Sequence, residues 1–182
     1  MPRKILSFVA RSGTGKTTLL EKLIAELTRR GRRVGAIKHT VHEVELDKPG
    51  KDSHRFLAAG ARAAIVASAG RIACFERRAA ETPLEELAAR LPDDLEIVIA
   101  EGFKHGSSAK IELHRKAQGD ALLCRGEADD PALVAVVSDA PLPLDVPVLP
   151  LDDVGAVADF VEEWFGGGPS KSRVADSDRR DL

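Results

Sequence analysis

The stretch from Ile5 to Leu20 reads ILSFVARSGTGKTTLL and is the strongest structural signal in the chain. Its first five residues form a short apolar run, which is typical of a parallel strand buried on both faces. From residue 20 onward apolar side chains recur at helical spacing, at Leu20, Leu23, Ile24 and Leu27. The stretch therefore predicts a strand that passes through a short glycine-containing loop directly into an amphipathic helix.

The loop between strand and helix contains the residue types that bind phosphate. Gly13 and Gly15 allow backbone angles and a close approach that a side chain would block. The turn and the helix N-terminus point several backbone N–H groups at one spot. Lys16 can reach the β- and γ-phosphates of a nucleoside triphosphate, and the Thr17 hydroxyl can ligate Mg²⁺. Residues 1–40 carry ten Lys and Arg against two Glu, a field that attracts an anion.

Composition limits the classes of protein to which the chain can belong. Its 182 residues, 43% hydrophobic and 31% charged, favour one globular domain with a substantial core. The formal net charge of −2 gives no reason to expect nucleic-acid binding. No apolar segment is long enough for a membrane span and no signal peptide is evident, so we expect a cytoplasmic protein. Cys74 and Cys124 lack the spacing of a zinc site and are expected to be free thiols.

Strands and helices alternate along the rest of the chain. Further strands are expected at residues 33–38, 63–67, 72–76, 95–100, 110–113, 133–137 and 146–149. Further helices are expected at residues 53–59, 83–91 and 154–165. This order predicts an α/β fold of the P-loop NTPase type, with a doubly wound, mostly parallel sheet and helices on both faces. We expect one domain over residues 1–165 and a disordered tail over residues 166–182.

Two acidic residues are candidates for a metal and catalytic site together with Lys16 and Thr17. Glu101 follows the predicted strand 95–100, at the end where P-loop proteins keep an acid that holds Mg²⁺ or orients water. The alternative is a strand-end glutamate that caps a neighbouring loop. Asp47 lies in the long polar loop after the second strand, and it can close on the γ-phosphate or Mg²⁺ as a switch loop does. An ordinary turn residue is the alternative for Asp47.

Several other polar residues allow two interpretations from the sequence alone. His39 and His42 can both face a metal or an anion, although nearby histidines in a polar loop are more often solvated. Lys51, Lys104 and Lys110 can contact phosphates or can be ordinary solvated lysines. The residues themselves do not decide between these interpretations.

Several short motifs occur in a characteristic order along the chain. They are Ser12 to Leu19, Ile37-Lys38-His39, Asp47-Lys48-Pro49-Gly50-Lys51-Asp52-Ser53, Ala59-Gly60-Ala61, Glu101-Gly102-Phe103-Lys104 and Lys110-Ile111-Glu112. Together, over roughly residues 4–165, they resemble the molybdopterin-guanine dinucleotide biosynthesis protein B family. The P-loop alone is common, so the specific part is the run from Asp47 to Ser53 followed by the Glu-Gly-Phe-Lys motif.

This resemblance implies particular roles for the motif residues. It implies phosphate binding by the loop residues Ser12, Gly13, Thr14, Gly15, Lys16, Thr17 and Thr18. It implies that Asp47 and Glu101 lie near Mg²⁺, together with Thr17. It implies a groove for nucleotide, cofactor or partner that is lined by Lys51, Asp52, Ser53, Lys104 and Lys110, and a role for Asp139 in recognising guanine.

The chain departs from the family pattern at two positions. Ala10 stands where the first glycine of the P-loop pattern is usual, and Ala109 stands where a proline before Lys-Ile-Glu is common. The first difference concerns the geometry of the loop entry, and the second concerns loop stiffness. No Asn-Lys-x-Asp guanine motif is present, so a preference for GTP over ATP rests on the resemblance alone.

The resemblance implies a weak GTPase that binds GTP and Mg²⁺, forms a homodimer, and assists the guanylyltransferase that joins GMP to molybdopterin. Molybdopterin or its guanine dinucleotide is a further expected ligand. Two alternatives stay open from the residues: an ATP-dependent small-molecule kinase, and a nucleotide-switched metallochaperone without significant turnover. The absence of an assignable arginine finger favours slow turnover, because such an arginine contributes about 10³–10⁵ in rate.

Overall fold

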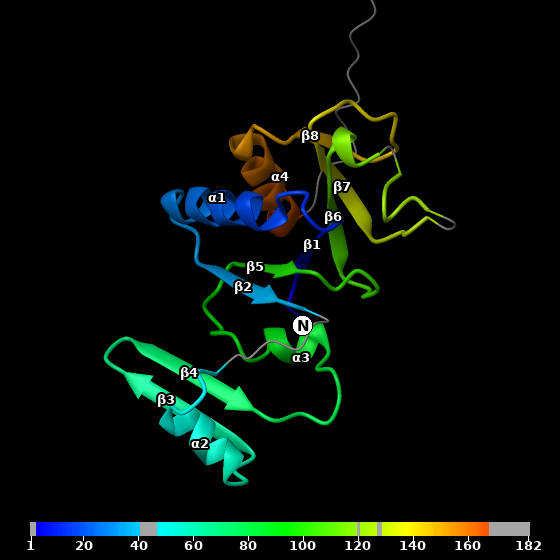
Figure 1. The fold of residues 1–182 in the computed structure, drawn as a ribbon. Coiled ribbons are helices and arrows are strands. Elements are labelled where there is room, and N and C mark those ends of the chain that lie inside the picture. The colour runs from blue at the N-terminus through cyan, green and yellow to red at the C-terminus, as the bar shows by residue number, and fades with distance from the viewer. Residues whose placement is uncertain (1–2, 41–46, 120, 127–128, 168–182) are drawn as a thin grey trace, which may run out of the picture. The chain divides into compact units, whose positions relative to one another are not determined.

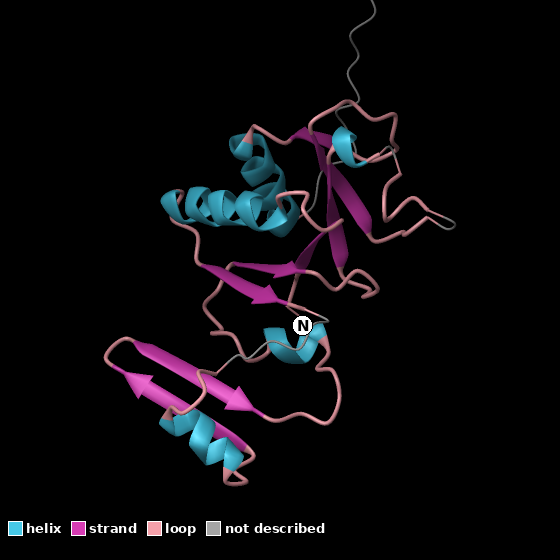
Figure 2. Cartoon of the chain, viewed as in Figure 1, coloured by secondary structure: helices cyan, strands magenta, loops and turns pink. Residues whose placement is uncertain are grey.

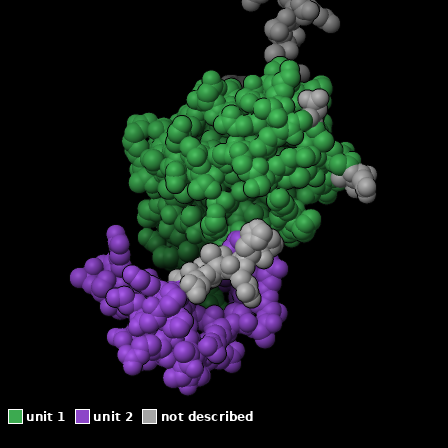
Figure 3. Space-filling model, viewed as in Figure 1, with its two compact units in different colours: residues 1–39, 88–182 green, residues 40–87 purple. Residues whose placement is uncertain are grey.

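The structure is a computed structural model that describes residues 3–40, 47–119, 121–126 and 129–167. The chain divides into two compact units, coloured separately in Figure 3. Unit 1 comprises Met1–His39 and Ala88–Leu182, and unit 2 comprises Thr40–Leu87. The single domain expected over residues 1–165 stays a prediction, and the expected tail lies outside the described residues from position 168 onward.

Unit 1 is built on a six-stranded sheet in the order β2-β5-β1-β6-β7-β8 (Figure 1). Every neighbouring pair is parallel, so the carboxyl ends of all six strands lie at one edge. The strands are β1 (Leu6–Ala10), β2 (Val34–Lys38), β5 (Ile97–Glu101), β6 (Ala109–His114), β7 (Leu133–Ser138) and β8 (Val148–Pro150). The helical elements are α1 (Lys16–Arg29), α4 (Val154–Gly166) and a 3₁₀ turn, η1 (Lys116–Gln118), shown in Figure 2.

Strand β1 sends alternate residues to opposite faces of the sheet, and an apolar cluster covers each face there. On one face, Leu6 and Phe8 of β1 pack in a large cluster with Leu23 of α1 and Val157 of α4. Figure 1 shows α1 and α4 side by side over this face. On the other face, Val9 belongs to a smaller cluster formed with Leu122, Cys124, Leu133 and Val136. Side chains of an irregular segment thus complete the second face.

Unit 2 contains a helix and a two-stranded antiparallel ribbon. Its helix is α2 (Asp52–Ala58), and the ribbon consists of β3 (Ala63–Ser68) and β4 (Arg71–Glu76). Gly70 makes the turn between the strands with a φ of 84°, an angle that glycine adopts without strain. A short helix, α3 (Leu84–Ala88), spans the boundary in the sequence between the two units: its last residue, Ala88, belongs to unit 1 and the rest to unit 2.

The predicted α/β fold with a mostly parallel sheet is confirmed, and all eight expected strands are present with ends shifted by up to two residues. The clearest difference is α3, which spans five residues instead of the expected 83–91. In the described part of the chain, we find no helix with both the length and the apolar character needed to cross a membrane.

Candidate functional site

The loop between β1 and α1 has the conformation that its glycines predict. Gly13 and Gly15 adopt φ angles of 77° and 93°, in the left-handed region that other residues rarely enter. Gly15 is the N-cap of α1, so the free N–H groups of the first helical turn begin at Lys16. Ala10, the departure from the usual pattern, is the last residue of β1 and is buried there. The loop therefore starts after Ala10 and presents its amides at the carboxyl edge of the sheet.

Glu101 is the centre of a compact group of charges at this edge. Its Oε1 atom accepts hydrogen bonds from Lys16 Nζ over 3.0 Å, from Lys38 Nζ over 3.1 Å and from Thr17 Oγ1 over 3.3 Å. The Glu101 side chain is only 14% exposed. Burial by itself raises the pKa of this carboxyl, but the hydrogen bonds from Lys16 and Lys38 outweigh it and hold the pKa below its ordinary value. Glu101 is therefore an ionised carboxylate at neutral pH.

The backbone immediately after Glu101 is unusual. Gly102 has a φ of 105°, and a Cβ atom there would lie 3.2 Å from the carbonyl oxygen of His39. Phe103 has a φ of 56° and is, among the described residues, the one non-glycine residue with a positive φ. Its ring stacks against His39 with 4.6 Å between ring centroids. A positive φ at a residue other than glycine persists where the surrounding structure holds it, often beside a functional site. Here the ring contact between Phe103 and His39 accompanies the turn that follows Glu101.

A second group of contacts ties the P-loop to the segment after β6. The Oγ1 atom of Thr14, which is buried, lies 2.7 Å from both the Gln118 side-chain oxygen and the Arg11 carbonyl oxygen, which share its one hydroxyl hydrogen as acceptors. Gln118 in turn donates to the Ser12 carbonyl over 3.2 Å. Arg115 donates from Nε to the Thr14 carbonyl over 2.8 Å. The outer side of the P-loop is therefore held by side chains about a hundred residues further along the chain.

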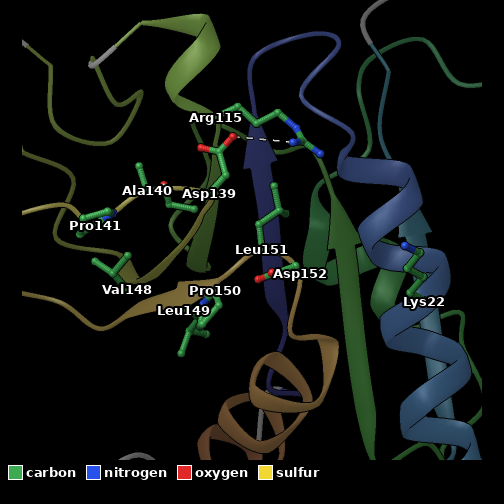
Figure 4. A pocket seen from close by; sticks show the side chains of 11 residues that line it. Lys22, Arg115, Asp139, Ala140, Pro141, Val148, Leu149, Pro150, Leu151 and Asp152 are labelled. Carbon is green, nitrogen blue, oxygen red and sulfur yellow. Dashed lines mark hydrogen bonds and ion pairs between the residues drawn. The ribbon is translucent and has the colours of Figure 1, made fainter.

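A cavity of about 540 Å³ lies at the carboxyl ends of β7 and β8. Figure 4 shows Asp139 and Arg115 facing each other here, with Lys22 of α1 on the opposite side of the cavity. The other residues that line it are Ser138, Ala140, Pro141, Val148, Leu149, Pro150, Leu151 and Asp152. Asp139 Oδ1 accepts a hydrogen bond from the Lys116 amide over 2.8 Å, and its Oδ2 lies 3.7 Å from an Arg115 nitrogen. The cavity thus combines apolar walls with acceptor groups from Asp139 and Asp152, close to the P-loop.

The remaining predicted residues are spread over both units. Asp47, Lys51, Asp52 and Ser53 belong to unit 2. Ser53 Oγ donates to Asp47 Oδ1 over 3.0 Å, while Asp47 Oδ2 is buried and has no hydrogen-bond partner among the described residues. A buried carboxylate oxygen without a partner is a suitable position for a ligand or cation. Lys51 is the N-cap of α2, and Asp52 pairs with Arg55 over 3.6 Å.

Lys104 and Lys110 occupy different environments in unit 1. Lys104 is exposed in the turn after β5. Lys110 lies near the start of β6, at the end of the strand opposite the P-loop, and pairs in register with Ser7. Its buried ammonium contacts the carboxylate of Asp130 over 2.7 Å and also bonds to the Gly106 carbonyl. The register of β6 therefore directs Lys110 to Asp130, and the structure does not bring it together with Lys16 and Glu101.

The residues around Glu101 fit both Mg²⁺ and phosphate. Mg²⁺ prefers oxygen ligands, and the Thr17 hydroxyl and the Glu101 carboxylate place two such oxygens 3.3 Å apart. Lys16, the helix N-terminus and the glycine turn supply positive charge and N–H donors for phosphate. A histidine metal site has no such support: His42 lies outside the described residues, and within them no group of three His, Cys, Asp or Glu side chains could hold a metal ion.

Comparison with known proteins identifies the family. The family described as Molybdopterin guanine dinucleotide synthesis protein B, or MobB, matches residues 5–139. The chain belongs to the MobB family. The resemblance drawn from the motifs is therefore confirmed.

MobB-family relatives match most of the chain. A molybdopterin-guanine dinucleotide biosynthesis adapter protein of Escherichia coli K12 is 48% identical over 170 residues, covering 88% of this chain and 93% of that protein. The adapter protein of the same description from Haemophilus influenzae is 40% identical over 162 residues, covering 88% and 89%. A crystal structure of a MobB homolog from Bacillus stearothermophilus matches with a TM-score of 0.67 at 27% identity, covering 89% of this chain and 97% of that chain.

Sequence reasoning about this MobB-family chain missed three residues of the site. Lys38 occurs in one family motif and Arg115 and Gln118 lie outside all of them, yet all three contact P-loop residues or Glu101. Lys38 could have been found from its position, because it ends a parallel strand on the same edge as the P-loop. Arg115 and Gln118 lie in an irregular segment without periodicity, so no local pattern indicates their contacts.

Proposed function

We propose that this MobB-family protein is a cytoplasmic, GTP-binding adapter in the formation of molybdopterin guanine dinucleotide, with weak intrinsic GTPase activity. Support for the pathway comes from the relatives, whose names describe adapter proteins of that biosynthesis and whose length this chain nearly covers. Support for the nucleotide comes from the P-loop and from the carboxylate of Glu101 beside it. The convergence of Lys16, Thr17 and Lys38 on one Glu101 oxygen is the observation that carries the proposal.

In this proposal Lys16 leaves Glu101 and binds the β- and γ-phosphates, while the amides from Ser12 to Thr18 surround them. Thr17 and Glu101 would hold Mg²⁺, directly or through its water ligands. The metal ion supplies positive charge that neutralises charge developing on the phosphates. Lys38 stays beside Glu101 and keeps its carboxylate ionised while Lys16 is engaged elsewhere.

The cavity beside Asp139 is the proposed site for the guanine base. A carboxylate only accepts hydrogen bonds, and guanine offers N–H donors at N1 and N2 on one edge. Adenine presents an acceptor at N1 instead, so an Asp139 carboxylate in this cavity favours GTP over ATP. The cavity lies at the carboxyl ends of β7 and β8, on the same edge of the sheet as the P-loop. Ligands of open α/β sheets bind at that edge.

Slow turnover and partner binding belong to the same proposal. GTPases that receive an arginine at the γ-phosphate are faster by about 10³–10⁵, and we propose that the guanylyltransferase partner or a second protomer supplies such a group. The β3–β4 ribbon of unit 2 exposes Ile65, Val66 and Ile72, with exposed fractions of 69%, 47% and 77%. A two-stranded ribbon is marginally stable by itself, so we propose that a second copy of the chain covers this surface in a homodimer.

The direct test of the adapter role is reconstitution with the guanylyltransferase. Purified guanylyltransferase, molybdopterin, GTP and Mg²⁺ are incubated with and without this protein, and the guanine dinucleotide formed is quantified. We expect the protein to raise the yield and Lys16→Ala to abolish the effect. Arg29→Ala is the control, because it removes an exposed cation of α1 that pairs with Glu26 and not with Glu101. An unchanged yield with the wild-type protein would contradict the proposal.

A further inference from the structure

Arg115 occupies the position between the P-loop and the cavity beside Asp139. It follows the last residue of β6, and its guanidinium has two sets of contacts. Arg115 Nε donates a hydrogen bond over 2.8 Å to the carbonyl of Thr14 in the P-loop. Arg115 Nη1 lies 3.7 Å from Asp139 Oδ2, the ion pair that Figure 4 draws as a dashed line. One side chain thus joins the phosphate loop to the cavity.

The contact with the P-loop is close and specific. A Cβ atom built on Gly15 would lie 3.5 Å from Arg115 Nη2, so the guanidinium is in van der Waals range of the glycine that begins α1. Thr14 is almost fully buried and is also fixed by Gln118, so its carbonyl has little freedom to move away from Arg115. Arg115 and Gln118 therefore hold the peptide group between Thr14 and Gly15 within the P-loop.

The contact with Asp139 is of the opposite kind, because it is long and solvent-accessible. The side chains of Arg115 and Asp139 are 43% and 33% exposed. Ion pairs as exposed as this contribute little, so a ligand in the cavity can displace Arg115 from Asp139 Oδ2 at a small cost. Asp139 Oδ1 keeps its hydrogen bond to the Lys116 amide, which holds the carboxylate in place during the exchange.

We propose that Arg115 is a positioning residue that couples base recognition in the cavity to phosphate binding at the P-loop. This inference rests on the proposed nucleotide-binding function. In the free protein Arg115 divides its donors between the Thr14 carbonyl and Asp139. A nucleobase with N–H donors replaces Arg115 at Asp139 Oδ2, and the guanidinium then acts on the P-loop alone. Binding of the base in the cavity thereby strengthens binding of the phosphates at the P-loop, and the reverse.

The coupling predicts effects of opposite sign for the two halves of the nucleotide when Arg115 is replaced. Guanosine probes the base site alone, and inorganic tripolyphosphate with Mg²⁺ probes the phosphate site alone. In Arg115→Gln, guanosine no longer competes with an ion pair and is expected to bind about two- to fivefold more tightly. Tripolyphosphate is expected to bind about tenfold more weakly, because the Thr14–Gly15 peptide loses its charged hydrogen-bond partner.

The experiment measures both dissociation constants for the wild-type protein, Arg115→Gln, Arg115→Lys and Arg29→Gln. Arg29→Gln is the control, since it removes one exposed arginine of α1 that pairs with Glu26 and lines neither the P-loop nor the cavity. Arg115→Lys keeps the charge but cannot serve Thr14 and Asp139 together, so it is expected to weaken the coupling while preserving the fold. Thermal unfolding of each variant checks that the fold is intact.

The outcomes separate this inference from the proposed function. Opposite shifts in Arg115→Gln, absent in Arg29→Gln, support the coupling. Parallel weakening of both ligands, or unchanged constants, would overturn it while leaving GTP binding by the wild-type protein intact. If the wild-type protein binds neither GTP nor tripolyphosphate, the proposed function fails and the inference fails with it.

Discussion

Lys38 and Glu101 are directly opposite each other in the register of two parallel strands, β2 and β5, and their side chains form a hydrogen bond of 3.1 Å. Glu101 thereby keeps a cationic partner that does not belong to the P-loop. In the proposed function the Lys16 ammonium exchanges Glu101 for phosphate, and Lys38 then keeps this largely buried carboxylate paired, since an unpaired buried charge is costly. The strand register thus gives Glu101 a second cationic partner in the nucleotide-free structure.

Replacement of Lys38 is expected to raise the pKa of the Glu101 carboxyl. Burial already raises this pKa, and the Lys38 hydrogen bond is one of the contributions that bring it below the ordinary value of 4.5. In Lys38→Met the pKa is expected to move upward, as measured by a carboxyl-carbon NMR titration of the ligand-free protein. Lys104→Met is the control with an exposed lysine, and an identical Glu101 pKa in Lys38→Met and the wild type would contradict the account.

The sign of the pH dependence follows from the same shift. Because the folded-state pKa lies below the unfolded value, the paired carboxylate stabilises the protein fully above about pH 4.5, and this stabilisation is lost as pH falls through the folded pKa. We expect a smaller acid-induced loss of stability in Lys38→Met than in the wild type. Chemical unfolding at pH 7 and at pH 4 measures both losses. A larger loss in the variant would contradict the assignment.

Lys110 is predicted to stabilise the fold. Its side chain is 2% exposed and pairs with Asp130, whose side chain is 27% exposed. Lys110→Met keeps the apolar volume but leaves Asp130 without its partner, and the expected loss is about 2–3 kcal/mol, below the range for fully buried pairs because Asp130 is partly hydrated. Urea unfolding measures this loss, with Lys104→Met as the exposed control. Equal stability of the two variants would show that the ion pair contributes little.

The two thiols are predicted to differ strongly in reactivity. Burial is the main cause that raises the pKa of Cys124 to about 12, and the neighbouring Glu112 carboxylate adds to the effect. Cys74 is exposed on β4. At pH 8 a chromogenic disulfide reagent is expected to label one thiol per chain rapidly and the second only after unfolding. Cys74→Ser should remove the rapid phase, and two rapid thiols would contradict the buried position of Cys124.

Sequence reasoning located β1, the loop and α1 because each signal there is local. The apolar run of β1, the glycines of the loop and the helical spacing of α1 all lie within about twenty-five residues. Helix α3 was overestimated, since Pro83 and Glu85 are typical of a helix start but no strong signal marks where such a helix ends. A short helix depends on its neighbours more than on its own residues.

Strand β6 shows why the rest of the site could not be predicted. Lys110, Glu112 and His114 alternate with apolar residues, a pattern usually typical of a strand with one solvated face. In the structure all three are buried, because Lys110 pairs with Asp130, Glu112 accepts the amides of Leu123 and Cys124, and His114 bonds to Ser138 and Gly119. Most of these partners come from residues 119–130, a segment without periodicity. Arg115 lies just before this segment, and its hydrogen bond to Thr14 joins residues about a hundred positions apart, so it is a property of tertiary structure alone.

The most direct test of the central claim is calorimetric titration of the purified protein with Mg²⁺-GTP and separately with Mg²⁺-ATP, with folded Lys16→Ala as the control. The account predicts saturable binding that is tighter for GTP and that is lost in Lys16→Ala, because Lys16 and the P-loop amides supply the phosphate contacts. Tighter binding of ATP would contradict the guanine assignment at Asp139 and favour a small-molecule kinase. Unchanged GTP affinity in folded Lys16→Ala would contradict phosphate binding at the P-loop itself.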